Sequence, residues 1–256
     1  MMEIHILGAH NLESAESRLV SLLIDDILAL DAGSLTSSLS LPAQGNIKAI
    51  LLTHYHFDHI RDIATLGLGT AYMSTTKVYS TPLVLDTLSS HLINGKIYPR
   101  LAQWPSPESP SLKFHPMEPY QQEVIEGYEV MMLPVRHNVP TVGYRVTSGG
   151  KSLFYSGDTG IGLSLCWPHL SPQLLIIELS GSNKWEAVMY EAGHLTPKSL
   201  KQELSEFQKL KGYLPRVVLI HMTPCLEDDI RDEVAQVAKE LNADITLAYE
   251  GMRLSL

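Results

Sequence analysis

The feature that most constrains this chain is an apolar run at residues 49–52, followed directly by Thr53-His54-Tyr55-His56-Phe57-Asp58-His59. Three imidazoles and one carboxylate fall within six positions, at His54, His56, Asp58 and His59. Because Asp is rarely buried unpaired and buried polar groups need hydrogen bonds, packing alone would have to supply four partners in one short segment. A divalent metal ion supplies them, and imidazole nitrogen with carboxylate oxygen suits zinc. We therefore predict a metal site at this position.

The expected local geometry supports the same site. If residues 49–52 form a buried strand, the alternation of side chains places His54 and His56 on one side of the chain as it leaves the sheet. Asp58 and His59 then follow on the next turn, aimed back toward the same space.

Length and composition indicate an ordinary globular protein. The 256 residues suffice for a substantial core, and we expect one domain over residues 1–256. The apolar fraction is 45% and the charged fraction 18%, and no run approaches the roughly 18 apolar residues of a membrane span. Two cysteines, Cys166 and Cys225, are too few for a disulfide framework, and the start of the chain lacks the pattern of a secretory signal. We expect a cytoplasmic protein without a membrane partner.

The net charge of −9 bears on the substrate. Proteins that bind long nucleic acids usually carry a basic patch that neutralises phosphates, and the sequence shows no basic run. A pair of bound divalent ions would still make the site itself positive. Extended nucleic acid is therefore disfavoured, whereas a small anionic substrate is compatible with the sequence.

Short β-type runs alternate with a few helical patterns along both halves of the chain. We expect strands at residues 4–7, 18–24, 27–30, 49–52, 77–80, 128–133, 141–147, 152–155, 174–177 and 217–220, and helices at residues 60–70, 82–90, 197–210 and 227–241. Asp25-Asp26 reads as a hairpin turn, and the proline-rich residues 97–119 as an irregular connection. This order favours two packed sheets sandwiched by helices.

Three more polar residues follow expected strands, namely His137, Asp158 and His221. Taken singly, each has a structural alternative: a loop cap, a turn residue or a hydrogen-bonded histidine. Strand ends that meet along one edge of a sandwich are, however, where a site can be assembled from distant segments. Together with the cluster at His54–His59, the three residues favour a shared metal site.

The arrangement resembles the metallo-β-lactamase superfamily of dinuclear hydrolases. The resemblance extends from Asp31-Ala32-Gly33, through residues 53–59 and Ser156-Gly157-Asp158-Thr159, to His221. It implies a four-layer αββα sandwich with two metal ions at one edge of the sheets. Aspartate at position 158, where true β-lactamases commonly have cysteine, points away from lactam hydrolysis.

The resemblance also implies the ligand roles. His54, His56 and His137 would bind one ion. Asp58, His59 and His221 would bind the other, with Asp158 bridging both. Two bridged ions can hold a hydroxide that is nucleophilic at neutral pH, so we expect hydrolysis, with Asp58 and Asp158 orienting that hydroxide. Zinc is the expected metal, and a ligand set without cysteine also tolerates manganese or iron.

Residues outside the ligand set bear on the substrate. His194 precedes the helix expected from Pro197, and the amides at a helix N-terminus attract phosphate. A histidine there can donate a hydrogen bond to a phosphoryl oxygen or protonate a leaving alkoxide. Its alternative role is a helix cap, which Thr196 performs better. We therefore expect a catalytic role for His194.

Two enzyme families share this region. Glu191 and His194 form a Glu-x-x-His-x-Thr pattern similar to one in the tRNA 3′-processing endonucleases (ribonuclease Z), where the pair is thought to shuttle a proton. Gly-His-Leu-Thr-Pro at residues 193–197, preceded by Glu178-Leu179-Ser180, resembles the class II cyclic-nucleotide phosphodiesterases more closely. His221-Met222-Thr223-Pro224 also resembles the last ligand motif of that family.

Our hypothesis from the sequence is a dinuclear phosphodiesterase for a small cyclic nucleotide or dinucleotide, in which Glu191 orients His194. Ribonuclease Z activity is the alternative, but the chain lacks a basic, glycine-rich arm for gripping RNA. A thioester hydrolase resembling glyoxalase II would leave the Glu191/His194 pair without a role. A binding protein without catalysis would be expected to have lost part of the ligand set. Dimers are common among such relatives, so a homodimer is possible by analogy.

Overall fold

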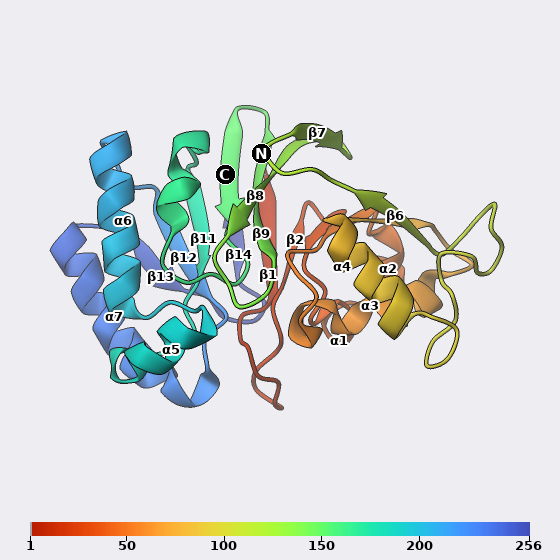
Figure 1. The fold of residues 1–256 in the computed structure, drawn as a ribbon, viewed down its shortest axis with the longest axis horizontal. Helices are drawn as coiled ribbons and strands as arrows, with labels where there is room; N and C mark the ends of the chain where they lie inside the picture. The colour runs from red at the N-terminus through yellow and green to blue at the C-terminus, as the bar shows by residue number, and fades with distance from the viewer. Residues whose placement is uncertain (1) are drawn as a thin grey trace.

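A computed structural model describes residues 2–256 of the chain. Two seven-stranded mixed sheets pack face to face, with helices on both outer sides (Figure 1). The αββα sandwich expected from the sequence is therefore confirmed.

The first sheet has the strand order β14-β1-β2-β3-β4-β5-β6. Its strands are β1 (Glu3–Gly8), β2 (Ser21–Ile24), β3 (Leu28–Leu30), β4 (Ala49–Leu51), β5 (Thr76–Ser80), β6 (Leu112–Pro116) and β14 (Arg253–Ser255). The second sheet has the order β13-β12-β11-β10-β9-β8-β7. Its strands are β7 (Gln122–Ile125), β8 (Tyr128–Val135), β9 (Thr141–Ser148), β10 (Lys151–Tyr155), β11 (Leu174–Glu178), β12 (Arg216–Ile220) and β13 (Ile245–Leu247).

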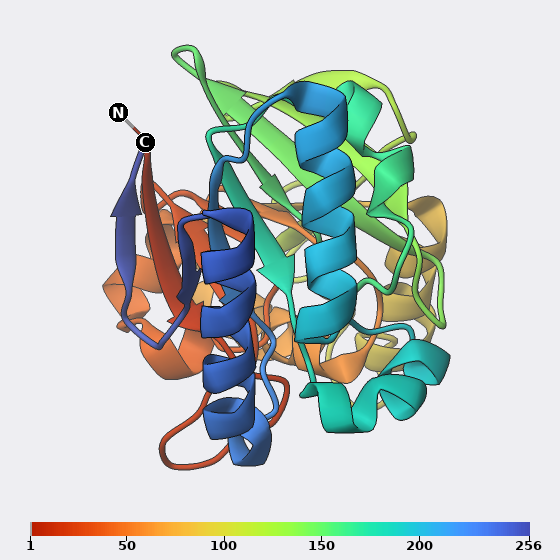
Figure 2. The same ribbon diagram turned by 90° about the vertical axis from the view of Figure 1, so that its left-hand side faces the viewer.

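Helices cover the outer face of each sheet. The first sheet carries α1 (Leu35–Ser38), α2 (Leu41–Asn46), α3 (Phe57–Thr70) and α4 (Pro82–Thr87), which Figure 1 shows grouped on one side. The second sheet carries α6 (Pro197–Lys211) and α7 (Glu227–Leu241), which lie side by side in Figure 2, with the short α5 (Glu186–Ala192) near one end of α6.

Alternation along the strands divides the apolar side chains between two cores. On β2, Leu22 and Ile24 face the other sheet, while Leu23 between them packs with Ile60 and Ile63 of α3. Because successive side chains of a strand point to opposite faces, one face of β2 is covered by the other sheet and the other face by helix α3. This burial holds the strand ends, and the loops that follow them, in fixed positions.

The hairpin predicted at Asp25-Asp26 joins β2 to β3. Both residues have positive φ, 47° and 60°, which a two-residue type I′ turn requires. The strand itself begins at Ser21 rather than at Arg18.

Other elements differ from the sequence-based expectation. β6 lies inside the proline-rich residues 97–119, where no strand was expected. It pairs with β5 alone at the edge of its sheet, and an edge strand tolerates proline because one side of its ladder is unpaired. α3 starts at Phe57 instead of residue 60, so Asp58 and His59 belong to its first turn. The short elements β7, α5, β13 and β14 were not predicted.

Within residues 2–256, none of the helices combines the length and apolar character that crossing a membrane requires.

Candidate metal centre

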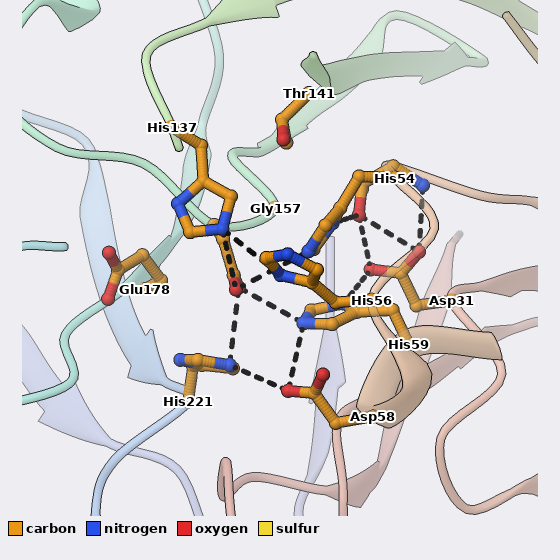
Figure 3. A network of polar contacts seen from close by, with 12 residues as sticks. Asp31, His54, His56, Asp58, His59, His137, Thr141, Gly157, Glu178 and His221 are labelled. Atoms are coloured by element: carbon orange, nitrogen blue, oxygen red, sulfur yellow. Dashed lines mark hydrogen bonds and ion pairs between the residues drawn. The ribbon is translucent and has the colours of Figure 1, made fainter. Parts of the chain in front are cut away.

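Four chain segments that leave the ends of strands meet at one edge of the sandwich. His54 follows β4, His137 follows β8, Asp158 follows β10 and His221 follows β12. β10 and β12 both run parallel to β11, and β9 is antiparallel to both β8 and β10, so β8, β10 and β12 all end at the same edge. Figure 3 shows the histidines from these segments turned toward one another. Residues separated by more than 160 positions are brought together in this way.

The first ligand group contains His54, His56, His137 and Asp158, with one donor atom from each within 4.8 Å of the others. Nε2 of His54 lies 3.6 Å from Oδ2 of Asp158, and Nε2 of His137 lies 3.8 Å from the same oxygen. Nε2 of His137 and Nδ1 of His56 are 3.3 Å apart. Three imidazoles and one carboxylate oxygen thus face a common point.

The second group contains Asp58, His59, His221 and again Asp158, also within 4.8 Å. Oδ1 of Asp158 lies 3.1 Å from Nε2 of His59 and 3.3 Å from Nε2 of His221. Oδ2 of Asp58 lies 3.2 Å from Nε2 of His221. Each oxygen of Asp158 therefore faces a different histidine group, so this carboxylate could contribute to the binding of two ions.

Unusual backbone conformations aim two of these side chains. His221 has φ of 66°, in the left-handed region that a non-glycine residue seldom occupies, and its N–H donates to the Ala9 carbonyl at 2.6 Å. Gly157, just before Asp158, has φ of 59°, and a Cβ there would lie 2.7 Å from Cγ2 of Thr53. Only glycine fits at position 157, whereas the strain at His221 persists because the surrounding structure enforces it, and such strain clusters at functional sites.

Unsatisfied atoms test whether the residues fit a metal. Within residues 2–256, Nε2 of His54, Nε2 of His59 and Oδ1 of Asp158 are buried and make no hydrogen bond of good geometry, although the last two atoms lie 3.1 Å apart. A buried polar atom left unpaired costs on the order of 1–3 kcal/mol. Three such atoms directed at one small region are stabilised only if something else binds them, and their chemistry is that of zinc ligands. The residues present fit two divalent ions.

The outer nitrogens of the histidines are held by the protein. Nδ1 of His59 donates to Asp31 at 2.7 Å, Nδ1 of His137 donates to the Gly193 carbonyl at 3.0 Å, and Nδ1 of His221 contacts Oγ of Ser180 at 2.8 Å. Engaging Nδ1 fixes the ring and leaves the Nε2 lone pair for the metal.

Asp31 is a residue of this centre that the ligand set inferred from the sequence does not include. It is fully buried at the end of β3, and Figure 3 shows it behind His59. Besides His59, it accepts hydrogen bonds from the N–H and hydroxyl of Thr53 and from the Tyr155 hydroxyl at 2.5 Å. The available signal was Asp31-Ala32-Gly33 directly after an apolar strand, which contributed to the family resemblance without a role being assigned.

We expect Asp31→Asn to weaken metal binding by about 10- to 100-fold, the usual cost of losing a carboxylate that supports a histidine ligand. The new amide would direct N–H groups at partners that are themselves donors. Metal titration of the stripped protein measures the effect, and Asp26→Asn, at an exposed turn position, is the matched control. Equal affinities of the two variants would contradict this role for Asp31.

Neighbouring charges set the protonation states of the ligands. Burial acts to raise the pKa of Asp158, but His221 and His59 hold it well below its ordinary value. Burial acts to lower the pKa of His59, yet Asp158 and Asp31 raise it well above the ordinary value. Burial holds the pKa of His54 well below the ordinary value. Asp158 is thus ionised and His54 neutral, which are the forms that bind metals, whereas His59 would have to release its proton when an ion binds.

His194 lies beside both ligand groups. Its ring is 4.9 Å from that of His137 and stacks on that of His221 at 5.3 Å. Nδ1 of His194 lies 3.1 Å from Oε1 of Glu178, a buried carboxylate that ends β11. Burial acts to lower the pKa of His194, but Glu178 outweighs this effect and raises it to about 9. Glu178 thus favours the protonated form of His194, which donates hydrogen bonds, next to the cluster.

The carboxylate that contacts His194 is therefore not the one expected from the sequence. Glu191 is exposed on α5, and within residues 2–256 no hydrogen bond or ion pair joins it to His194. Glu178 also accepts hydrogen bonds from the Ser180 hydroxyl and the Leu195 N–H, so the whole carboxylate is fixed.

The N-terminus of α6 also differs from the expectation. Thr196 is the N-cap, as predicted. The first-turn N–H of Lys198 donates to Oδ1 of Asn183 at 2.8 Å, and Oγ of Ser199 accepts from Thr196 N–H at 2.8 Å. Because side chains of the protein use these groups, the amides expected to attract phosphate are partly occupied, and His194 is the group there that faces the centre.

A two-sheet sandwich with this His/Asp cluster at one edge defines a metallo-β-lactamase fold. A family model described as the beta-lactamase superfamily domain matches residues 22–222, and the chain belongs to this family.

Similar proteins include phosphodiesterases and nucleases. The cGMP-dependent 3′,5′-cGMP phosphodiesterase A of Dictyostelium discoideum is 32% identical over 141 residues, which is 51% of this chain and 14% of that protein. Ribonuclease Z of Mycobacterium sp. (strain KMS) is 29% identical over 128 residues, 46% of this chain and 45% of that protein. The matches thus span less than half the length of either relative. Unliganded yeast PDE1 superposes with a TM-score of 0.83 at 19% identity, covering 100% of this chain and 99% of that one.

Proposed function

We propose that this protein is a dinuclear metal-dependent phosphodiesterase that hydrolyses a small cyclic nucleotide or dinucleotide phosphodiester. The observation that carries the proposal is the shared carboxylate: Oδ2 of Asp158 faces His54 and His137, while Oδ1 faces His59 and His221. Similarity to a cGMP phosphodiesterase over half of the chain supports the substrate class.

The metal ligands in this proposal are the two groups described above. His54, His56 and His137 would hold one ion, Asp58, His59 and His221 would hold the other, and Asp158 belongs to both groups. Zinc is the default because the donors are imidazole nitrogens and carboxylate oxygens, with manganese and iron compatible. Ions bound there would supply a nucleophile at neutral pH and polarise the phosphoryl oxygen.

In this proposal, side chains of the protein donate the proton that the leaving group needs. His194 is placed to donate a hydrogen bond to the phosphoryl group or a proton to the leaving oxygen, because Nδ1 is engaged by Glu178 and Nε2 remains for the substrate. Glu178 takes the orienting role that the sequence suggested for Glu191. Since Glu178 favours the protonated imidazole, the pair is suited to general acid catalysis.

Ribonuclease Z activity is the second candidate, because a ribonuclease Z matches 46% of the chain. A folded RNA requires an extended basic surface, and each phosphate contact needs a cationic partner. The net charge is −9, and an exposed cation, Arg136, directly precedes His137 in the sequence. These features favour a small substrate.

A substrate comparison tests the proposal. The metal-reconstituted protein is assayed against 2′,3′- and 3′,5′-cyclic nucleotides, a dinucleotide, pre-tRNA and S-lactoylglutathione, with the chelator-stripped protein as the control. We expect hydrolysis of at least one small phosphodiester, lost on stripping and restored by zinc or manganese. Cleavage of pre-tRNA alone, or of the thioester alone, would contradict the proposal.

A further inference from the structure

A pocket of about 270 Å³ adjoins the metal centre. It lies between α5, the start of α6 and the loop after β10. Its walls are largely apolar and include Ile161, Ala187 and Tyr190, and His194 belongs both to this pocket and to the surroundings of the ligands. His194 therefore links the pocket to the candidate metal centre.

We propose that this pocket binds the nucleobase of the substrate and makes the enzyme selective for nucleotides over other phosphodiesters. This inference rests on the proposed function, since it assumes that a phosphodiester occupies the metal centre. It adds a recognition site formed by Tyr190, Ala187 and Ile161, with Tyr190 as the stacking surface.

Tyr190 has the properties of a stacking surface. It is 51% exposed, yet its ring is held in place. Nη2 of Arg136 donates to the Tyr190 hydroxyl at 3.2 Å, and the guanidinium carbon lies 5.0 Å from the ring centroid. Because a cation already fixes this exposed aromatic ring, the ring loses little conformational entropy when a ligand binds. Any of the nucleobases can stack on such a ring, since each has a flat π-face.

Another part of the pocket wall belongs to the loop that follows Asp158. The loop after Asp158 is fixed by two short backbone contacts: Gly160 N–H to the Arg136 carbonyl, and Gly162 N–H to Oε1 of the buried Glu203, both at 2.6 Å. Ile161 lies between these anchors and lines the pocket. The pocket is thus preformed, and its position relative to Asp158 is fixed.

Charge indicates which part of a nucleotide the pocket takes. The lining includes the Glu186 carboxylate, whose partner is Lys198 at 2.9 Å, and its only residue able to carry positive charge is His194 at the boundary with the metal centre. Apart from His194, the lining itself offers a phosphate no cation, whereas an uncharged ring buries apolar surface there. The phosphate belongs at the metals and the base in the pocket.

Equilibrium binding to the metal-loaded protein tests the inference. Guanosine and adenosine 5′-monophosphates are compared with ribose 5-phosphate, which has the phosphate and sugar but no base. We expect the wild-type protein to bind at least one mononucleotide about 10-fold or more tightly than ribose 5-phosphate, in line with one base–aromatic stack. Tyr190→Ala should remove most of that difference and leave ribose 5-phosphate affinity unchanged, while Tyr190→Phe should retain the difference.

Two further variants distinguish a specific effect on base binding from misfolding or a change that affects every ligand. Ala187→Phe fills the pocket from a second position and should also weaken mononucleotide binding selectively. Val188→Ala, at an exposed position of α5 outside the lining, is the control and should behave as wild type. A wild-type protein without preference for mononucleotides, or variants that weaken both ligands equally, would overturn the inference.

The outcome is separable from that of the proposed function. If mononucleotides bind with the Tyr190-dependent preference but no cyclic nucleotide or dinucleotide is hydrolysed, the proposed function fails and the pocket stands. If small phosphodiesters are hydrolysed but Tyr190→Ala leaves the mononucleotide preference intact, the function stands and the pocket assignment fails.

Discussion

Asp158→Asn is expected to lower kcat/KM by about a thousand-fold or more, since metal ions contribute several kcal/mol of charge stabilisation to such reactions. Its two oxygens face different histidine groups, so a neutral amide would weaken both halves of the site. We expect fewer than two bound ions per chain, measured by elemental analysis after reconstitution. Added metal should also raise the melting temperature of the wild-type protein much more than that of the variant.

Asp232→Asn is the matched control for this change. Asp232 is exposed on α7, so the same substitution there should alter neither metal content nor rate. An Asp158→Asn protein that holds two ions per chain and stays within a few-fold of wild-type activity would show that Asp158 is not a shared ligand. The melting temperature without metal separates loss of ions from loss of fold.

His194→Ala is expected to lower kcat by about 100- to 10,000-fold on a substrate with an alkoxide leaving group, the range for losing general acid catalysis. Both ions should remain, because His194 contacts the ligand rings without belonging to either dinuclear ligand group. A p-nitrophenyl phosphodiester has a leaving group that needs little protonation. The loss with that substrate should be much smaller, which a merely structural role would not produce.

Glu178→Gln and Glu191→Gln form a matched pair that tests which carboxylate supports His194. Glu178→Gln should reduce kcat on the alkoxide substrate by about 10-fold or more, because an amide no longer favours the protonated imidazole. Glu191→Gln should leave the rate unchanged, since Glu191 is exposed on α5. If Glu191→Gln reduces the rate and Glu178→Gln does not, the assignment from the structure is wrong. For the His194→Ala variant described above, loss of bound metal would show that His194 is itself a metal ligand.

Much of the fold follows from local sequence patterns. The strands around the centre and helices α6 and α7 were predicted because their apolar residues recur at the period of the element that contains them. α5 was missed because it is one short helix of seven residues without buried side chains, so it carries no apolar periodicity. β6 was missed because proline normally argues against a strand, and only its position at a sheet edge removes that objection.

Residue chemistry by itself predicted a metal site at His54–His59 and seven candidate ligand positions, because several imidazoles and carboxylates at strand ends have few other uses, and the structure brings these side chains together. Tertiary structure alone decided which side chains support them. Asp31 meets His59 across β3 and α3, and Glu178 meets His194 although Glu191 is nearer in sequence. The physical reason is that metal ligands are marked by residue type, whereas a supporting hydrogen bond depends on a distance of about 3 Å between atoms that only the folded chain sets.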